Sequence, residues 1–72
     1  MSLTTIRISS DYITLGQFLK EAGIIETGGQ AKWFLADYDV DINGQADNRR
    51  GRKLYPGDHL NVPEVGEFII EK

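Results

Sequence analysis

The chain has 72 residues, of which 40% are hydrophobic and 26% are charged, and its formal net charge is −3. A chain of this length buries only about 60% of its unfolded surface, which is enough for one thin core and one domain, residues 1–72, but leaves little protein for a deep substrate cavity. Because it contains no cysteine and only one histidine, disulfides, thiolate zinc sites and multi-histidine metal sites are excluded.

The first half of the chain predicts one strand and two helices. Residues 5–9 alternate and place Ile6 and Ile8 on one face, as in a strand. Thr14 and Gln17 then form a capping box, and Gly23 is the residue expected just after the end of this helix. The apolar stripe between these signals, at helical spacing, consists of Leu15, Phe18, Leu19 and Ala22.

A second capping box predicts the second helix, with Thr27 at the N-cap and Gln30 three residues later. The helix is expected to run to about Asp37. At 100° per residue, Lys32 and Trp33 point away from its buried side. That buried side is expected to consist of Ala31, Phe34 and Leu35.

From Asp39 onward the pattern changes to a period of two, with Val40 and Ile42 facing inward. Asn43-Gly44 is typical of a type I′ hairpin, and the return arm, residues 45–53, is too polar and basic for an ordinary buried strand. The remaining features are a return to the core at Leu54, a tight turn of type II at Pro56-Gly57, and short strands at residues 60–62 and 68–70. The sum is an α+β domain of two adjacent short helices and a small, mainly antiparallel sheet.

Two segments favour anion binding. Gly28 and Gly29 stand in the expected first turn of the second helix, where free N–H groups and the helix dipole attract a phosphate. The alternative is that these glycines only permit a tight helix–helix corner. The second segment, the basic arm, carries half of the basic residues within five positions, namely Arg49, Arg50, Arg52 and Lys53. Its alternative is a self-neutralising surface in which Asp47 faces Arg49.

Trp33 is an aromatic residue on the polar side of a helix, where it can stack on a nucleobase or pack on Tyr38, Tyr55 or the last strand.

The sequence contains no convincing catalytic arrangement, since His59 has no nucleophile beside it and no serine lies in a nucleophile-elbow motif. We therefore expect no enzyme activity, no cofactor and no metal site. The absence of a long apolar run and of a leader pattern in residues 1–10 predicts a cytoplasmic protein without membrane association.

The order and spacing of these segments resemble the S4 RNA-binding domain. That family has a helix ending in glycine, a Ser/Thr-led second helix, a Val-x-Val-Asn-Gly hairpin and a closing Pro-Gly-Asp turn. Here these segments read LGQFLKEAG, TGGQAKWFL, VDING and YPGDHL. More narrowly, ITLGQFLK, GGQAKWFL and DNRRGRKL are similar to the small stand-alone S4-domain proteins of the YaaA type, found mainly in Gram-positive bacteria.

The resemblance implies an S4-like (alpha-L) motif that binds structured RNA through the two-helix face and the hairpin. The implied target is ribosomal RNA or a pre-ribosomal particle, and the implied role is maturation of the large ribosomal subunit by a protein that is monomeric when free. Carried over by position, the RNA-facing helix start consists of Thr27, Gly28, Gly29, Gln30 and Lys32. The basic arm adds Arg49, Arg50, Arg52 and Lys53, and Trp33 is included for its stacking potential.

Two departures from the S4 pattern matter. The first helix commonly begins Arg-Leu-Asp, but this chain has Thr14-Leu15-Gly16, so Thr14 and Lys20 are left out of the predicted site. Tyr38 replaces the glycine usual between the second helix and the hairpin, and is expected to strain that corner or change the helix exit. The alternative function is a small protein-interaction or carrier domain of β-grasp-like type, although such carriers need a reactive tail, commonly Gly-Gly, and this chain ends Ile-Ile-Glu-Lys.

Overall fold

The computed structural model describes residues 3–72, so residues 1–2 of the expected domain lie outside the described residues. Two helices and seven strands follow one another along this part of the chain. Their bounds are β1 Leu3–Arg7, β2 Ile13–Thr14, α1 Leu15–Glu21, α2 Gln30–Asp37, β3 Val40–Ile42, β4 Gln45–Asp47, β5 Lys53–Leu54, β6 His59–Val62 and β7 Gly66–Glu71. The predicted α+β class with two short helices is confirmed.

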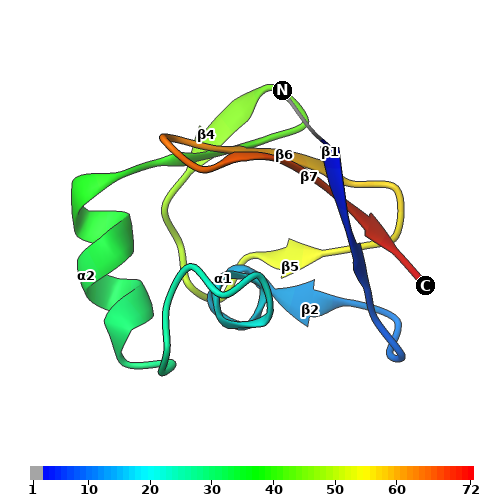
Figure 1. Ribbon diagram of the computed structural model, residues 1–72, viewed down its shortest axis with the longest axis horizontal. Coiled ribbons are helices and arrows are strands. Elements are labelled where there is room, and N and C mark those ends of the chain that lie inside the picture. The colour runs from blue at the N-terminus through cyan, green and yellow to red at the C-terminus, as the bar shows by residue number, and fades with distance from the viewer. Residues whose placement is uncertain (1–2) are drawn as a thin grey trace.

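Five of the strands form one sheet in the order β1-β7-β6-β3-β4, and β2 pairs with β5 in a separate two-stranded sheet. All neighbours are antiparallel except β1 and β7, which run parallel. Figure 1 shows the main sheet across the top, α1 end-on beneath it, α2 to one side and the small sheet below. The helices and the small sheet thus lie on the same side of the main sheet.

The core lies between the main sheet and α1. The rings of Phe18 on α1 and Phe68 on β7 pack edge to face, with centroids 5.1 Å apart. Strand alternation supplies the sheet side of this core, which contains Val40, Ile42, Leu60, Val62, Phe68 and Ile70. The helices and connecting segments add Ile8, Leu15, Phe18, Leu19, Ile25, Ala31, Leu35 and Leu54.

The caps predicted for α1 are both confirmed. Thr14 accepts a hydrogen bond from the backbone N–H of Gln17 through its Oγ1 (3.2 Å), and Gln17 accepts from the backbone N–H of Thr14 through its Oε1 (3.0 Å). At the other end Gly23 has φ of +75°, and the N–H groups of Gly23 and Ile24 donate to the carbonyls of Lys20 and Leu19. This is a Schellman motif, and it turns the chain sharply toward α2.

The first strand begins and ends two residues earlier than the predicted 5–9. Its register with β7 runs from Leu3 opposite Glu67 to Arg7 opposite Glu71. Ile8 is buried just beyond the strand and donates its N–H to the carbonyl of Glu71. The alternation of apolar residues identifies which face of this strand points inward, but not where the strand begins and ends. Those limits depend on the residues of β7 with which the strand pairs.

The hairpin and the later turn are confirmed and are joined to each other. Asn43 and Gly44 have φ of +54° and +88°, as a type I′ turn requires. Gly57 has φ of +96°, and the N–H of Asp58 donates to the carbonyl of Tyr55, as in a type II turn. The side chain of Asn43 donates to Asp58 (3.0 Å) and accepts from the backbone N–H of His59 (3.0 Å), so these two motifs stabilise one another.

Tyr38 does not strain the exit from α2. Its backbone is extended, with φ of −134° and ψ of 135°, and its N–H donates to the carbonyl of Phe34. The chain therefore passes directly from the helix into β3 without the left-handed residue that a glycine would supply. Phe34 is only partly buried, contrary to the prediction, because its ring packs beside Tyr38 at the margin of the core (centroids 5.1 Å apart).

Candidate nucleic-acid interface

The helix α2 begins at Gln30 with Gly29 as its N-cap, so the prediction of Thr27 as N-cap is wrong. Half of the expected capping box is present, because Gln30 Oε1 accepts hydrogen bonds from the N–H groups of Glu26 (2.6 Å) and Thr27 (3.1 Å). The carbonyls of Thr27 and Gly28 accept from the N–H groups of Gln30 and Ala31. Each of these two hydrogen bonds joins residues that are three apart, so the segment forms a tight turn before the helix, and both glycines lie in this turn.

The two glycines are open to solvent on the side where a side chain would project. A Cβ atom built on Gly28 would have no other atom within 4 Å, and one on Gly29 would meet only Thr27 Oγ1 at 4.0 Å. The alternative that these glycines permit a tight helix–helix corner is therefore wrong. The glycine at that corner is Gly16, whose Cβ would lie 3.5 Å from the Arg50 carbonyl oxygen and 3.7 Å from Ala31 Cβ.

The basic arm, Arg49–Lys53, contains both paired and unpaired cations. Asp47 Oδ2 lies 2.8 Å from Arg49 Nη2 and 3.0 Å from Arg52 Nη1. Hydrogen bonding by Arg49 holds the pKa of the Asp47 carboxyl well below its usual range, and the same pair raises the pKa of Arg49. Asp47 thus pairs with two of the four cations and offsets the charge of one, whereas Arg50 and Lys53 form no ion pair within residues 3–72.

The backbone of the basic arm is fixed against the start of α1. The carbonyls of Arg52 and Arg50 accept hydrogen bonds from the N–H groups of Leu15 (2.8 Å) and Gly16 (3.0 Å). These N–H groups belong to the first turn of α1, where no carbonyl of the same helix can reach them. The arm therefore occupies the N-terminus of α1, whereas the turn before α2 has open space beside Gly28 and Gly29.

A hollow of about 310 Å³ lies where α1, the turn before α2 and the basic arm meet. We call it the interhelix hollow. It is lined by Thr14, Gly16, Gln17, Lys20, Gly28, Ala31 and Arg50. It brings together one residue from each predicted segment, Gly28 and Arg50, which are far apart in sequence. The lining also includes Thr14 and Lys20, which were left out of the predicted site. The sequence feature that could have identified them is their place at the start and on the polar side of α1, opposite its apolar stripe.

The other predicted site residues do not line the hollow. Thr27, Gly29 and Gln30 belong to the turn and to the first residue of α2. Lys32 and Trp33 lie on the outer side of α2, with Lys32 Nζ 6.0 Å from the centroid of the indole ring. Arg49, Arg52 and Lys53 continue along the arm.

Trp33 is 71% exposed, so the alternative that it packs on a neighbouring element is wrong. Tyr38 packs on Phe34 and Tyr55 packs on Tyr12, and the indole ring stays in solvent. An exposed indole beside a lysine can contact a nucleobase or another molecule at low conformational cost.

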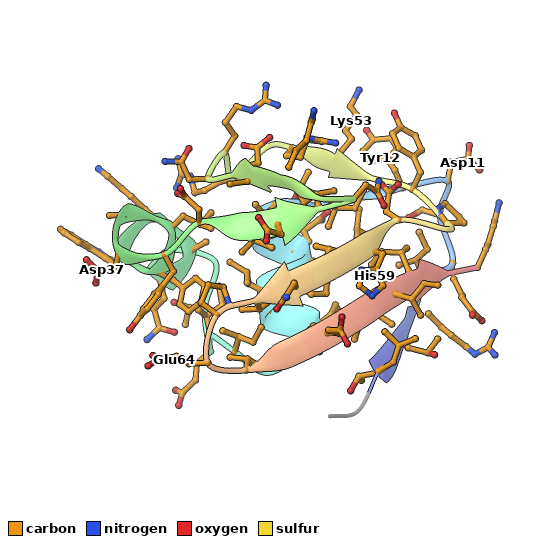
Figure 2. All side chains as sticks on the ribbon, turned by 90° about the horizontal axis from the view of Figure 1, so that it is seen from above. Asp11, Tyr12, Asp37, Lys53, His59 and Glu64 are labelled. Atoms are coloured by element: carbon orange, nitrogen blue, oxygen red, sulfur yellow. The ribbon has the colours of Figure 1, made fainter. Side chains whose placement is uncertain are left out.

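The residues considered for catalysis or metal binding lie elsewhere. His59 is partly exposed on β6, where its Nε2 lies 3.7 Å from Glu67 Oε1 on the outer face of the main sheet (Figure 2). Within residues 3–72, the acidic and histidine side chains form no group of three placed to hold a metal ion. Over the same residues, neither helix has the length and apolar character needed to cross a membrane.

This sequence is similar to known sequences over most of its length. A family model for the S4 domain matches residues 6–71. The probable ribosome maturation protein RlbA of Bacillus subtilis (strain 168) is 54% identical over 65 residues, a region that covers 90% of this chain and 92% of that protein. No solved structure matches the chain at a significant level. With its two-helix face, its hairpin and its Pro-Gly-Asp turn all present, the chain belongs to the S4 domain family.

Proposed function

We propose that the protein binds structured RNA through the interhelix hollow and the basic arm, and that it acts by binding rather than by catalysis. The observation that carries the proposal is the meeting of Lys20, Arg50 and the open backbone of Gly28 around one hollow. Two cations and a side-chain-free turn suit a phosphate group, since a guanidinium binds phosphate through paired hydrogen bonds. A phosphodiester backbone supplies such groups at regular spacing.

The proposed RNA is ribosomal, and the proposed role is in the maturation of the large ribosomal subunit. The S4 family and the name of the Bacillus relative, a probable ribosome maturation protein, support this choice. We propose that the protein binds folded RNA mainly through its backbone and shape, because the hollow is small and lined by residues that suit phosphate more than base edges. The carrier alternative has no observation in its favour.

The experiment that tests the proposal compares two single-charge variants for binding to purified large-subunit ribosomal RNA and to immature large-subunit particles. Arg50→Ala removes a cation of the hollow. Lys72→Ala removes a cation that pairs with Asp11 (3.0 Å) outside it. We expect Arg50→Ala to weaken RNA binding and Lys72→Ala to leave it unchanged, with equal thermal stability. Equal losses from both variants, or no binding by the unchanged protein, would contradict the proposal.

A further inference from the structure

Two exposed tyrosines form a pair at one border of the molecule. The ring centroids of Tyr12 and Tyr55 lie 5.8 Å apart, and the side chains belong to residues that are 39% and 49% exposed. Lys53 Nζ lies 5.0 Å from the centroid of the Tyr12 ring. Figure 2 shows Lys53 and Tyr12 side by side, beyond the main sheet. We call Tyr12, Lys53 and Tyr55 the tyrosine platform.

The strand pairing of the small sheet explains why these side chains gather. In the antiparallel register of β2 and β5, Ile13 lies opposite Leu54 and Thr14 opposite Lys53. Side chains alternate between the faces of a strand, and Leu54 is fully buried with Ile13 packed against the core. The residues before β2 and after β5 must therefore share the outward face with Thr14 and Lys53.

The tyrosine platform adjoins the interhelix hollow. Thr14 lines the hollow and is the direct ladder partner of Lys53, which belongs to the platform and to the basic arm. Arg50 in the hollow and Lys53 on the platform are also the two cations of the arm that form no ion pair within residues 3–72. A strand of RNA whose phosphates followed these two cations would pass from the hollow onto the tyrosine platform.

The backbone of each platform tyrosine takes part in the hydrogen bonds of the fold, and within the described residues its hydroxyl does not. Tyr55 donates its N–H to Asp58 Oδ2 (2.8 Å), and its carbonyl accepts from the N–H of Asp58. The carbonyl of Tyr12 accepts from the hydroxyl of Ser10 (2.8 Å). The hydroxyl of Tyr38, in contrast, donates to Glu64 (3.2 Å), whereas the platform hydroxyls make no hydrogen bond within residues 3–72. Both rings are therefore available to a ligand.

We propose that the tyrosine platform stacks an unpaired nucleobase of the RNA whose phosphates occupy the interhelix hollow. This inference rests on the proposed function and narrows the ligand to RNA in which unpaired nucleotides adjoin a structured part. Aromatic side chains stack on any base because every base has a π face. Paired bases do not present that face to a protein surface, so the platform selects the single-stranded neighbour of a helix. The nearby ammonium of Lys53 suits the phosphate of the stacked nucleotide.

The test uses one RNA hairpin in two forms, blunt-ended and with a short single-stranded extension, and three proteins. We expect the unchanged protein to bind the extended RNA at least about fivefold more tightly than the blunt one, the gain of one stacked base. Tyr55→Leu removes the ring and is expected to abolish this gain while binding the blunt hairpin normally. Tyr55→Phe keeps the ring and is expected to retain the gain. Thermal melts check that all three proteins fold alike.

Placing 4-thiouridine in the extension gives a second readout, because irradiation links it to the residue it contacts. We expect the crosslink at Tyr12 or Tyr55; a crosslink at Trp33 alone would overturn the inference. It would also be overturned if both RNAs bind equally or if Tyr55→Leu keeps the gain, and the tyrosine pair would then serve another partner, such as a protein chain. Failure of the unchanged protein to bind even the blunt hairpin would instead refute the proposed function itself.

Discussion

At the scale of single residues, Asp47 decides how much positive charge the basic arm presents. Its carboxylate binds Arg49 and Arg52 and also accepts the backbone N–H of Arg49 (2.9 Å). The side chain of Asp47 is only 10% exposed, whereas that of Arg49 is 71% exposed. In the free protein Asp47 therefore holds two guanidinium groups that phosphate oxygens could otherwise bind.

Acid is expected to remove the contribution of Asp47 to stability. Because the pKa of Asp47 is lower in the folded protein than in the unfolded chain, its pairing stabilises the fold above the unfolded value of about 4 and is lost as the pH falls from there. Asp47→Asn should thus lower the melting temperature at pH 7, and the difference from the unchanged protein should shrink below pH 4. Thermal melts of both proteins between pH 7 and about pH 2.5 measure this difference in melting temperature. A difference that does not vary with pH would mean that the charge is not its cause.

Gly28 and Gly29 offer a matched pair of substitutions, since only Gly28 lines the interhelix hollow. Gly28→Ala should weaken RNA binding by placing a methyl group where phosphate approaches, and Gly29→Ala should weaken it less. Neither should destabilise the fold, because both sites have room for a Cβ and neither backbone is left-handed; Ala in such a site raises stability by up to about 1 kcal/mol. Binding isotherms and thermal melts on both variants check this. A fall in stability would instead indicate a packing role.

At the scale of elements, the parts with local signals were predictable and the parts made by long-range pairing were not. The caps of α1, the Asn43-Gly44 turn and the Pro56-Gly57 turn each follow from a few adjacent residues, and all are confirmed. The β2–β5 sheet has only two residues in each strand, too few for a period to appear in the sequence. The interhelix hollow could not be predicted because it forms only when the arm docks on α1; the sequence showed Lys20 only as part of the polar side of that helix.

The link between the hairpin and the Pro-Gly-Asp turn gives a prediction for Asn43. Asn43→Gly keeps the positive φ but loses the side-chain hydrogen bonds to Asp58 and to the backbone N–H of His59, and should cost about 1–3 kcal/mol. Asn43→Ala loses the same side-chain hydrogen bonds. It must also hold alanine in a left-handed backbone conformation, which adds about 1 kcal/mol to the loss of stability. Chemical denaturation of the unchanged protein and both variants measures their free energies of unfolding and shows whether Asn43→Ala loses more stability than Asn43→Gly. Equal losses would show that the backbone conformation of Asn43 carries no cost.

At the scale of the whole molecule, the hollow and the outer face of the main sheet differ in charge. The charged residues that line the hollow are the cations Lys20 and Arg50, whereas the outer face of the main sheet carries Asp41 and Glu67 in one cross-strand row with Asn61 between them. The C-terminal end of α2 is also acidic, since Asp37 is its last residue and Glu64 accepts a hydrogen bond from the Tyr38 hydroxyl (3.2 Å; Figure 2). Both carboxylates raise the pKa of Tyr38, most of all through the Glu64 hydrogen bond. We therefore expect RNA to bind on the side of the hollow and the arm, although the net charge of the protein is −3.

Salt dependence tests this arrangement. Lys20, Lys32, Arg50 and Lys53 form no ion pair within residues 3–72, and neutralising four phosphates gives a log–log slope of affinity against salt of roughly −3 to −4. Asp47→Asn should release Arg49 and Arg52, raise the affinity at low salt and steepen the slope by about 1 to 2. Titrations at several salt concentrations provide both slopes. A slope near zero would place the bound RNA away from these cations.

The parallel pairing of β1 with β7 has a consequence for how the chain folds as it is made. β1 is made first, but among the described strands its only neighbour in the sheet is β7, so Leu3 has no strand partner until Glu67 has been made. The two helices and the β3–β4 hairpin need only neighbours in sequence and can form early, whereas closing so long a loop is slow. The strand that closes the sheet, β7, is therefore the last to leave the ribosome, and a nascent chain of 60 residues contains every residue that lines the interhelix hollow but lacks the strand that completes the sheet.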